Sequence, residues 1–310
     1  MEDIIVRVEH LSHRYSIQWA VRDVSFEIPR HGIYGLLGAN GAGKSTVMNI
    51  MCGVLKQTEG DVIIAGVNTK RDTIAAKKHI GFLPQKPPLY QDLTVEEYLT
   101  HAADLRWVTP REMKKAVEEV MERCAITHFR KRLLKNLSGG YQQRVGIAQA
   151  IVHKPDLVVF DEPTNGLDPN QIVEIRHLIK SIAEERTVIL STHILSEVQA
   201  TCNNIKMIEQ GKLVFSGSMD EFNNYVAPST LLITLDAAPP ESTLEAIEGV
   251  ARVEKVDPRN YRLQFDASKD ISEQVVQLSV ANGWQLSEIQ LERQSLDAIF
   301  AQLSGKKVQQ

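Results

Sequence analysis

Short runs of consecutive apolar residues alternate with segments of helical periodicity between residues 4 and 226. Uninterrupted apolar runs are typical of parallel strands that are buried on both faces. The expected strands cover residues 4–8, 24–28, 33–37, 62–64, 80–83, 157–161, 187–191, 205–208 and 212–215. The expected helices cover residues 47–52, two segments within 94–125, 139–152, 170–185 and 219–226. This alternation predicts an α/β fold.

The segment between residues 94 and 125 has helical periodicity with no strand in between. Thr94 and Glu97 have the spacing of a capping box, and Pro110 suits the first turn of a second helix. Apolar residues recur at helical spacing at Leu99, Ala102, Ala103 and Trp107, and then at Met113, Val117, Val120, Met121 and Cys124. We therefore expect a helical subdomain at about residues 86–153.

The character of the chain changes from about residue 229. Strand patterns occur at 231–235, 252–256, 261–265 and 284–291, and helix patterns at 243–248, 271–281 and 296–303. The order βαββαβ plus one helix predicts a small α+β domain of the ferredoxin-like kind. We therefore expect one domain at residues 1–228 and a second at 229–310.

Composition and charge are those of an ordinary soluble globular protein. The 310 residues are 43% hydrophobic and 24% charged, and the net charge is −4. Residues 229–310 account for this net charge, because they carry eight Lys or Arg and twelve Asp or Glu. A protein without a basic face is not expected to bind nucleic acid.

Cysteine usage and the lack of long apolar runs indicate a cytoplasmic location. Cys52, Cys124 and Cys202 lack metal-ligand spacing and are interpreted as reduced thiols used as small apolar residues. The acidic start of the chain lacks the layout of a signal peptide. No apolar run approaches the ~20 residues that span a bilayer. Any association with a membrane is therefore expected to depend on a partner.

A glycine-rich loop connects the expected strand at 33–37 to the expected helix at 47–52. It matches G-x-x-x-x-G-K-[ST] throughout, and its candidate phosphate-binding residues are Gly38, Ala39, Asn40, Gly41, Ala42, Gly43, Lys44, Ser45 and Thr46. Glycines let successive N–H groups point at a phosphate, and the helix N-terminus adds its positive dipole end. Lys44 can place its charge on the β- and γ-phosphates, and the Ser45 hydroxyl can reach Mg²⁺. This context predicts a nucleotide-binding site.

A second helix start with anion-binding character lies at Ser138, Gly139 and Gly140. Ser138 suits the N-cap position, and the two glycines expose backbone N–H groups beside it. A simple P-loop enzyme with one site needs only one such helix start, so the second one requires an explanation.

Two carboxylates follow the apolar run that ends near residue 161. Asp161 can hold Mg²⁺ through water, and Glu162 is the candidate to polarise an attacking water. The alternative is that two acids simply end a strand at the surface.

Tyr15 could stack on adenine or cover a sheet edge, and Gln85 is a loop amide of a kind that is usually solvated. His193, at a strand end, could bond the γ-phosphate or be structural.

Taken in order along the chain, these motifs resemble those of an ABC ATPase. The resemblance covers residues 4 to about 226 and rests on Gly38–Thr46, Gln85, Leu137–Gly140, Asp161–Glu162, Asp168 and His193. The Leu-Ser-Gly-Gly signature is the discriminating motif, since many NTPases have a P-loop. Residues 82–90 and the acidic C-terminal domain resemble bacterial ABC-2-type exporter subunits, a group that includes drug-resistance and gliding-motility ATPases. The resemblance implies a P-loop NTPase core.

The resemblance implies a role for each residue of the nucleotide site. Tyr15 would stack on adenine, and the catalytic residues would be Glu162, His193, Lys44 and Gln85. Gln85 would sense Mg²⁺ and the γ-phosphate, and its loop would contact a membrane partner. His193 would be the γ-phosphate switch.

The resemblance also explains the second helix start. Ser138 and Gly140 would bind the γ-phosphate of an ATP held by a second copy, and Asp168 would lie at the dimer seam. Tyr141 stands where many relatives have Gln, but it leaves Ser138 and Gly140 unchanged, so we expect a competent signature. Two copies, or one copy and a homologous subunit, would enclose two ATP molecules.

The function expected from these features is ATP hydrolysis coupled to transport, with export favoured, through a separate transmembrane permease. The protein would then lie at the cytoplasmic face of the membrane. An importer subunit is an alternative, because importers use the same ATPase core. Soluble ABC proteins of translation usually carry two motif sets in one chain, whereas this chain has one. DNA-maintenance ATPases place a long coiled coil between Gln85 and Leu137, an interval that is short here.

Overall fold

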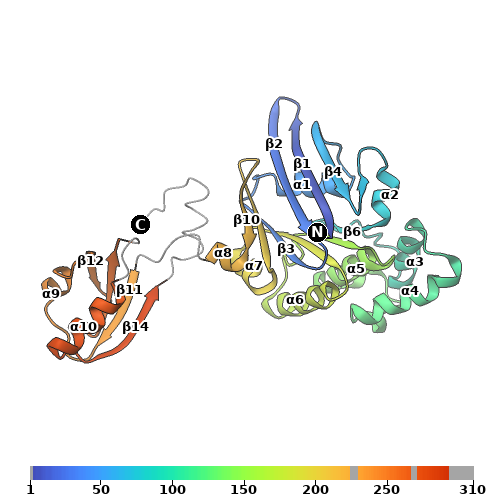
Figure 1. The fold of residues 1–310 in the computed structure, drawn as a ribbon. Coiled ribbons are helices and arrows are strands. Elements are labelled where there is room, and N and C mark those ends of the chain that lie inside the picture. Colours follow the sequence, from blue (N-terminus) through green and yellow to red (C-terminus); the bar gives the residue numbers. More distant parts are fainter. Residues whose placement is uncertain (1–2, 224–229, 267–270, 293–310) are drawn as a thin grey trace. The chain divides into compact units, whose positions relative to one another are not determined.

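The chain divides into two compact units, Met1–Met219 and Asp220–Gln310 (Figure 1). The computed structural model describes residues 3–223, 230–266 and 271–292. The domain boundary expected at 228/229 and the helix expected at 296–303 lie outside the described residues. The two-domain boundaries and the limits of the helical subdomain stay predictions.

A six-stranded sheet forms the centre of the larger unit. In spatial order its strands are β10 (Lys212–Ser218), β9 (Asn204–Glu209), β3 (Gly32–Leu37), β8 (Thr187–Thr192), β7 (Leu157–Asp161) and β6 (Ile80–Leu83). All neighbouring strands are parallel except the antiparallel hairpin of β9 and β10. Every residue of β7 and β8 is buried, as their apolar runs predict. The carboxyl ends of β3, β6, β7 and β8 therefore share one edge, where α/β folds bind ligands.

A second sheet is antiparallel and has the order β2 (Gln18–Pro29), β1 (Ile4–Tyr15), β4 (Glu59–Ile64) and β5 (Val67–Asn68). The sequence predicted only parts of β1 and β2, at 4–8 and 24–28. Register shifts interrupt their pairing after Val8 and Leu11, and His10 and Asp23 have positive φ. Such bulges break the alternation of apolar and polar residues that identifies a strand.

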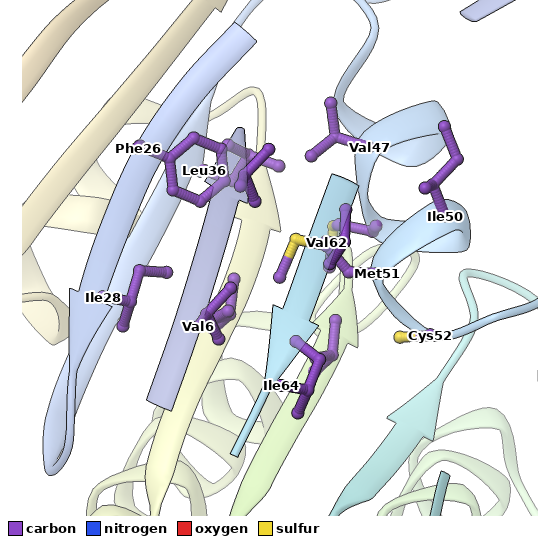
Figure 2. Close-up of a cluster of buried hydrophobic side chains, with 14 of the residues drawn as sticks. Val6, Phe26, Ile28, Leu36, Val47, Ile50, Met51, Cys52, Val62 and Ile64 are labelled. Atoms are coloured by element: carbon purple, nitrogen blue, oxygen red, sulfur yellow. The ribbon is translucent and has the colours of Figure 1, made fainter. Parts of the chain in front are cut away.

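The helix that follows the glycine-rich loop, α1 (Lys44–Met51), is fixed by a hydrophobic core (Figure 2). Val47 and Met51 of α1 share this buried cluster with Val62 and Ile64 of β4. All four side chains are at most 1% exposed. Burial of each such side chain stabilises the fold by roughly 1.5–3 kcal/mol. The start of α1, and with it the loop, is therefore held in a rigid setting.

The region with helical periodicity contains α3 (Val95–Leu105), α4 (Pro110–Arg123), the 3₁₀ turns η1 (Thr127–Phe129) and η2 (Leu134–Asn136), and α5 (Gly139–Ile151). The predicted capping box is present, since the Thr94 N–H donates to the Glu97 carboxylate at 2.8 Å and the Glu97 N–H to the Thr94 hydroxyl at 3.3 Å. Ser138 is the N-cap residue of α5, but its side chain makes no capping hydrogen bond. The other helices of the first 223 residues are α2 (Thr73–Lys78), α6 (Pro169–Ala183), α7 (Leu195–Thr201) and α8 (Met219–Asn223).

The second unit contains an antiparallel sheet with the order β12 (Val250–Lys255), β13 (Asn260–Phe265), β11 (Thr230–Leu235) and β14 (Leu286–Glu292). Two helices, α9 (Glu241–Glu245) and α10 (Ser272–Asn282), complete the order βαββαβ that the sequence predicts. Alternate residues of β11 pack with Leu244 of α9 and Val275 of α10 in a separate core. The ferredoxin-like assignment stays a prediction.

His153, just after α5, is expected to make the fold sensitive to acid. Its Nε2–H donates to the Ile80 carbonyl at 3.1 Å, and burial, followed by the nearby charge of Arg106, lowers its pKa from 6.5 to about 4. Below pH 6.5 the unfolded chain binds a proton at His153, whereas the folded chain binds it only near pH 4. The free energy of unfolding therefore decreases as the pH is lowered from 6.5 to about 4. The loss between pH 7 and pH 5 is about 2 kcal/mol. Urea unfolding should show it in the native chain and in the exposed control His177→Gln, but not in His153→Gln.

Candidate functional site

A cleft of about 670 Å³ opens at the carboxyl edge of the central sheet. Chain segments far apart in the sequence line it: the end of β1, the loop between β3 and α1, and the segments that follow β6, β7 and β8. Its lining residues are Tyr15, Ala20, Asn40, Gly41, Gly43, Lys44, Ser45, Thr46, Gln85, Glu162, Asn165 and His193. The structure therefore brings together ten of the residues that the sequence assigns to the nucleotide site, whereas Gly38, Ala39, Ala42 and Asp161 do not line the cleft.

Close packing requires glycine at two positions of the loop. Gly43 has a φ of +111°, and a Cβ there would lie 2.7 Å from the Ala20 carbonyl oxygen. At Gly38 a Cβ would lie 2.2 Å from the Ile208 carbonyl oxygen. The loop thus approaches the backbone of β2 and β9 more closely than any side chain allows. Its shape is held by the sheets as well as by its own sequence.

Lys44 supplies a buried positive charge to the cleft. It is 5% exposed, and its ammonium donates to the carbonyls of Gly38 at 2.8 Å and Ala39 at 3.2 Å. Burial lowers the pKa of Lys44, whereas the carboxylates of Glu162 and Asp161 act in the opposite direction. A buried ammonium beside exposed loop N–H groups is a strong point charge for a phosphate.

Glu162 lies at the end of β7 and is hydrogen-bonded from three sides. Gln85 donates its Nε2–H to one carboxylate oxygen at 2.8 Å, and Asn165 donates to the same oxygen at 3.2 Å. The Nδ1 of His193 lies 2.9 Å from the other oxygen. Because an ionised carboxylate only accepts, Nδ1 carries the proton in this contact. These donors use three of the roughly four lone-pair sites of the carboxylate, which leaves one for a water molecule.

The backbone of Glu162 is in a strained conformation. Its φ is +49°, in the left-handed region that residues other than glycine seldom adopt. Ser191 holds it there, because the Glu162 N–H is shared between the Ser191 hydroxyl at 3.1 Å and the Ser191 carbonyl at 3.2 Å. The Ser191 hydroxyl in turn donates to Asp161. Strain that the surroundings maintain is common at functional sites, because it aims one side chain away from the regular strand direction.

The residues beside Asp161 fit a magnesium ion. The Ser45 hydroxyl donates to the Asp161 carboxylate at 3.4 Å, so two hard oxygen ligands already lie side by side at the mouth of the loop. Among the described residues there is no cluster of three or more His, Cys, Asp or Glu that could enclose a metal. Mg²⁺ in phosphate sites does not require such a cluster, since it takes one or two protein oxygens and completes its shell with phosphates and water.

Tyr15 is an aromatic residue of the cleft lining. Its side chain is exposed, at 52%, and its ring packs edge-on against His13 with centroids 4.7 Å apart. An exposed ring face next to the phosphate loop suits a flat heterocycle. This position favours the stacking interpretation of Tyr15, which stays a prediction.

The structure does not bring every predicted residue into the cleft. Ser138 and Gly139 are exposed, and the space around the position of a Gly139 Cβ is open. Gly140 and Asp168 line a different hollow of about 270 Å³. Asp168 caps α6 by accepting from the N–H groups of Asn170 and Gln171 at 3.1 and 3.0 Å. The signature segment is therefore absent from the phosphate site of its own chain.

Sequence reasoning missed three contributors to the cleft and its support. Asn165 lies in a turn that gave no chemical signal, yet it donates to Glu162. Ser191 lies near the end of β8, where a small polar residue carries no chemical signal in the sequence. Its hydrogen bonds to Asp161 and Glu162 become visible only in the fold. Ala20 lines the cleft through the pairing of β1 with β2.

Comparison with known families and proteins agrees with this geometry. The family described as "ABC transporter" matches residues 21–165, and a second, "AAA domain, putative AbiEii toxin, Type IV TA system", matches residues 133–198. The linearmycin resistance ATP-binding protein LnrL of Bacillus subtilis is 31% identical over 307 residues, 97% of this chain and 99% of its own. The bacitracin transport ATP-binding protein BcrA of Bacillus licheniformis is 38% identical over 68% of each chain.

Solved structures of ABC transporter cassettes are also similar to this chain. CbiO1 from Clostridium perfringens, part of the ABC transporter complex CbiONQ, superposes with a TM-score of 0.65 at 29% identity, over 71% of this chain and 90% of its own. The cassette MJ0796, solved as a dimer bound to ADP and phosphate, has a TM-score of 0.63 at 26% identity, over 69% and 98%. With the P-loop NTPase fold, the cleft and a relative matched over nearly its whole length, the chain belongs to the family of ABC transporter ATP-binding subunits, ATPases that hydrolyse ATP to power transport.

Proposed function

We propose that the protein is the ATP-hydrolysing subunit of an exporter and acts as a dimer around two ATP molecules. The observation that carries the proposal is the convergence of Lys44 and the triply bonded Glu162 on one cleft. Export is supported by LnrL and BcrA, whose names refer to drug resistance and drug transport. LnrL matches through the second unit as well.

The proposed chemistry is in-line attack of water on the γ-phosphate. Lys44 and the loop N–H groups bind the phosphates, Tyr15 stacks on the adenine, and Glu162 accepts the proton of the attacking water. Gln85 and His193 hold the two oxygens of Glu162 and face the γ-phosphate. Ser45 and Asp161 would hold Mg²⁺, which when bound neutralises charge on the β- and γ-phosphates.

The proposed dimer is supported by the division of the predicted site between two places. Lys44 and the phosphate loop line the cleft, whereas Ser138 at the start of α5 is exposed and lies outside it. Two copies arranged head to tail would place the Ser138 and Gly140 N–H groups of one copy against the ATP of the other, with Asp168 at the seam. ATP then joins the pair, and hydrolysis releases it.

Replacement of Lys44 by Ala is expected to weaken ATP binding by about 10- to 100-fold, because a hydrogen bond to a charged group contributes about 1.5–3 kcal/mol. Titration with a fluorescent ATP analogue measures it. Lys56→Ala removes an exposed lysine just beyond the same helix and should leave affinity unchanged. Equal affinity in both variants would contradict the role of the loop.

The partner is proposed to be a polytopic permease, which would place the protein at the cytoplasmic face of the membrane. No helix among the described residues is long and apolar enough to cross a bilayer. After detergent solubilisation, the tagged full chain should therefore retain a protein with several membrane spans. Retention of ribosomes or DNA in its place would favour the non-transport alternatives over this one.

A further inference from the structure

Glu197 is a buried carboxylate behind the cleft that contacts the two segments carrying Glu162 and His193. It lies in α7 and is 6% exposed. Its Oε1 accepts the hydroxyl of Thr164 at 2.6 Å, and its Oε2 accepts the hydroxyl of Thr192 at 2.8 Å. Thr164 lies two residues after Glu162, and Thr192 directly precedes His193. One side chain therefore joins the loop after β7 to the last residue of β8.

The contact with Thr192 belongs to a closed set of bonds around His193. The Thr192 hydroxyl accepts the N–H of Ile194 at 3.0 Å while it donates to Glu197. The N–H of Glu197 donates to the Ile194 carbonyl at 3.2 Å. The backbone on both sides of His193 is thus tied to one carboxylate, which fixes the direction in which the imidazole leaves the strand. That direction brings Nδ1 within 2.9 Å of Glu162.

The contact with Thr164 acts on the other loop. Glu162 keeps its positive φ only while its neighbours hold the chain on both sides. Ser191 holds the residue itself, and the Asn165 N–H donates to the Glu162 carbonyl at 3.2 Å. Thr164, between them, is anchored to Glu197. The strained turn is therefore anchored at Thr164 by the same carboxylate that orients His193.

Stability alone does not account for a carboxylate here. Its side-chain donors are two neutral hydroxyls, and none of the ion pairs between described residues includes Glu197. Burial of a charge without a cation is costly, and a well-packed apolar residue would avoid that cost. A carboxylate is, however, the side chain that accepts a hydroxyl on each of two oxygens at once.

We propose that Glu197 is a positioning residue that sets Glu162 and His193 relative to each other, so that the proton acceptor and the γ-phosphate contact are placed together. The inference rests on the proposed roles of these two residues. It predicts an effect on the rate of the chemical step and little effect on nucleotide binding.

The primary test is Glu197→Gln in the full chain. Glutamine accepts one hydroxyl with its oxygen, but its N–H groups can only donate, so the other hydroxyl must turn to accept and its own proton loses its partner. We expect kcat for ATP hydrolysis to fall about 10-fold, in the range seen when groups that orient catalytic ligands are changed, with KM within about twofold. Glu184→Gln, at an exposed position beyond α6, should keep the native kcat.

Thr192→Val and Thr164→Val remove one connection each and should lower kcat in the same way. In the double variant Thr192→Val with Glu197→Gln, kcat should fall by less than the product of the two single losses. Both substitutions act on the same hydrogen bond, between Thr192 and Glu197. The melting temperature reports on folding, and should Glu197→Gln fail to fold, the two threonine variants carry the same test.

Unchanged kcat in Glu197→Gln would overturn the proposal. A loss of kcat accompanied by a loss of nucleotide affinity and a lower melting temperature would also overturn it, because a purely structural role predicts that result. So would a double variant whose loss of kcat equals the product of the losses in the two single variants. Failure of the proposed function is distinguishable, since the native chain would then not hydrolyse ATP or Glu162→Gln would keep the native rate.

Discussion

Replacement of Glu162 by Gln is expected to lower kcat for ATP hydrolysis by about 10²–10⁴-fold while ATP still binds, because a positioned general base contributes about that factor. The amide keeps the shape of the side chain but cannot accept a proton at neutral pH. Lys44 donates its hydrogen bonds to the carbonyls of Gly38 and Ala39 and not to Glu162, so nucleotide affinity should change little. Bound ATP then remains intact, and the ATP-bound dimer should accumulate in gel filtration with ATP and Mg²⁺.

Glu27→Gln is a suitable control for this experiment. Glu27 lies on β2, half exposed and paired with Arg7, so its substitution removes one carboxylate without touching the cleft. It should hydrolyse ATP at the native rate and form no persistent dimer. Hydrolysis by Glu162→Gln at the native rate would show that another group accepts the proton.

The central sheet and the phosphate loop were predictable because their signals are local. An uninterrupted apolar run such as Leu157–Phe160 is typical of a strand buried on both faces, and the glycine loop is recognised from its own residues. The strands of the antiparallel sheet were predicted only in part, because bulges near His10 and Asp23 shift the alternation. Helix limits were predicted to within a few residues where caps exist, as at Thr94.

The support of the site was not predictable, because it depends on contacts between distant loops. Ser191 lies 29 residues from Glu162, and Thr164 lies 33 residues from Glu197. Nothing in a single strand end marks a serine or threonine as a donor to another loop, and a glutamate on an amphipathic helix is by default exposed. The sequence predicts which residues carry the chemistry, whereas the fold shows which side chains are hydrogen-bonded to them.

Replacement of Ser138 by Arg is expected to lower kcat for ATP hydrolysis by about 100-fold or more, without weakening the binding of ATP to a single chain. Ser138 is exposed, makes no capping bond and does not line the cleft that holds Lys44. In a monomer the substitution therefore touches nothing in the nucleotide site. In the dimer it places a large cation where the phosphate of the partner's ATP must approach the helix start.

The decisive measurement separates binding from association. The double variant Ser138→Arg with Glu162→Gln should bind ATP with the affinity of Glu162→Gln alone but form no ATP-dependent dimer. The control places Ser242→Arg, at an exposed helix start in the second unit, in the same Glu162→Gln background and should leave the dimer intact. A mixture of Ser138→Arg and Lys44→Ala chains should regain hydrolysis, because each mixed dimer contains one site with an intact loop and an intact helix start. A loss of ATP affinity in the Ser138→Arg monomer would instead mean that the site is complete within one chain. The opposite result means that the loop at Gly38–Thr46 is half of a site whose other half lies in a second chain.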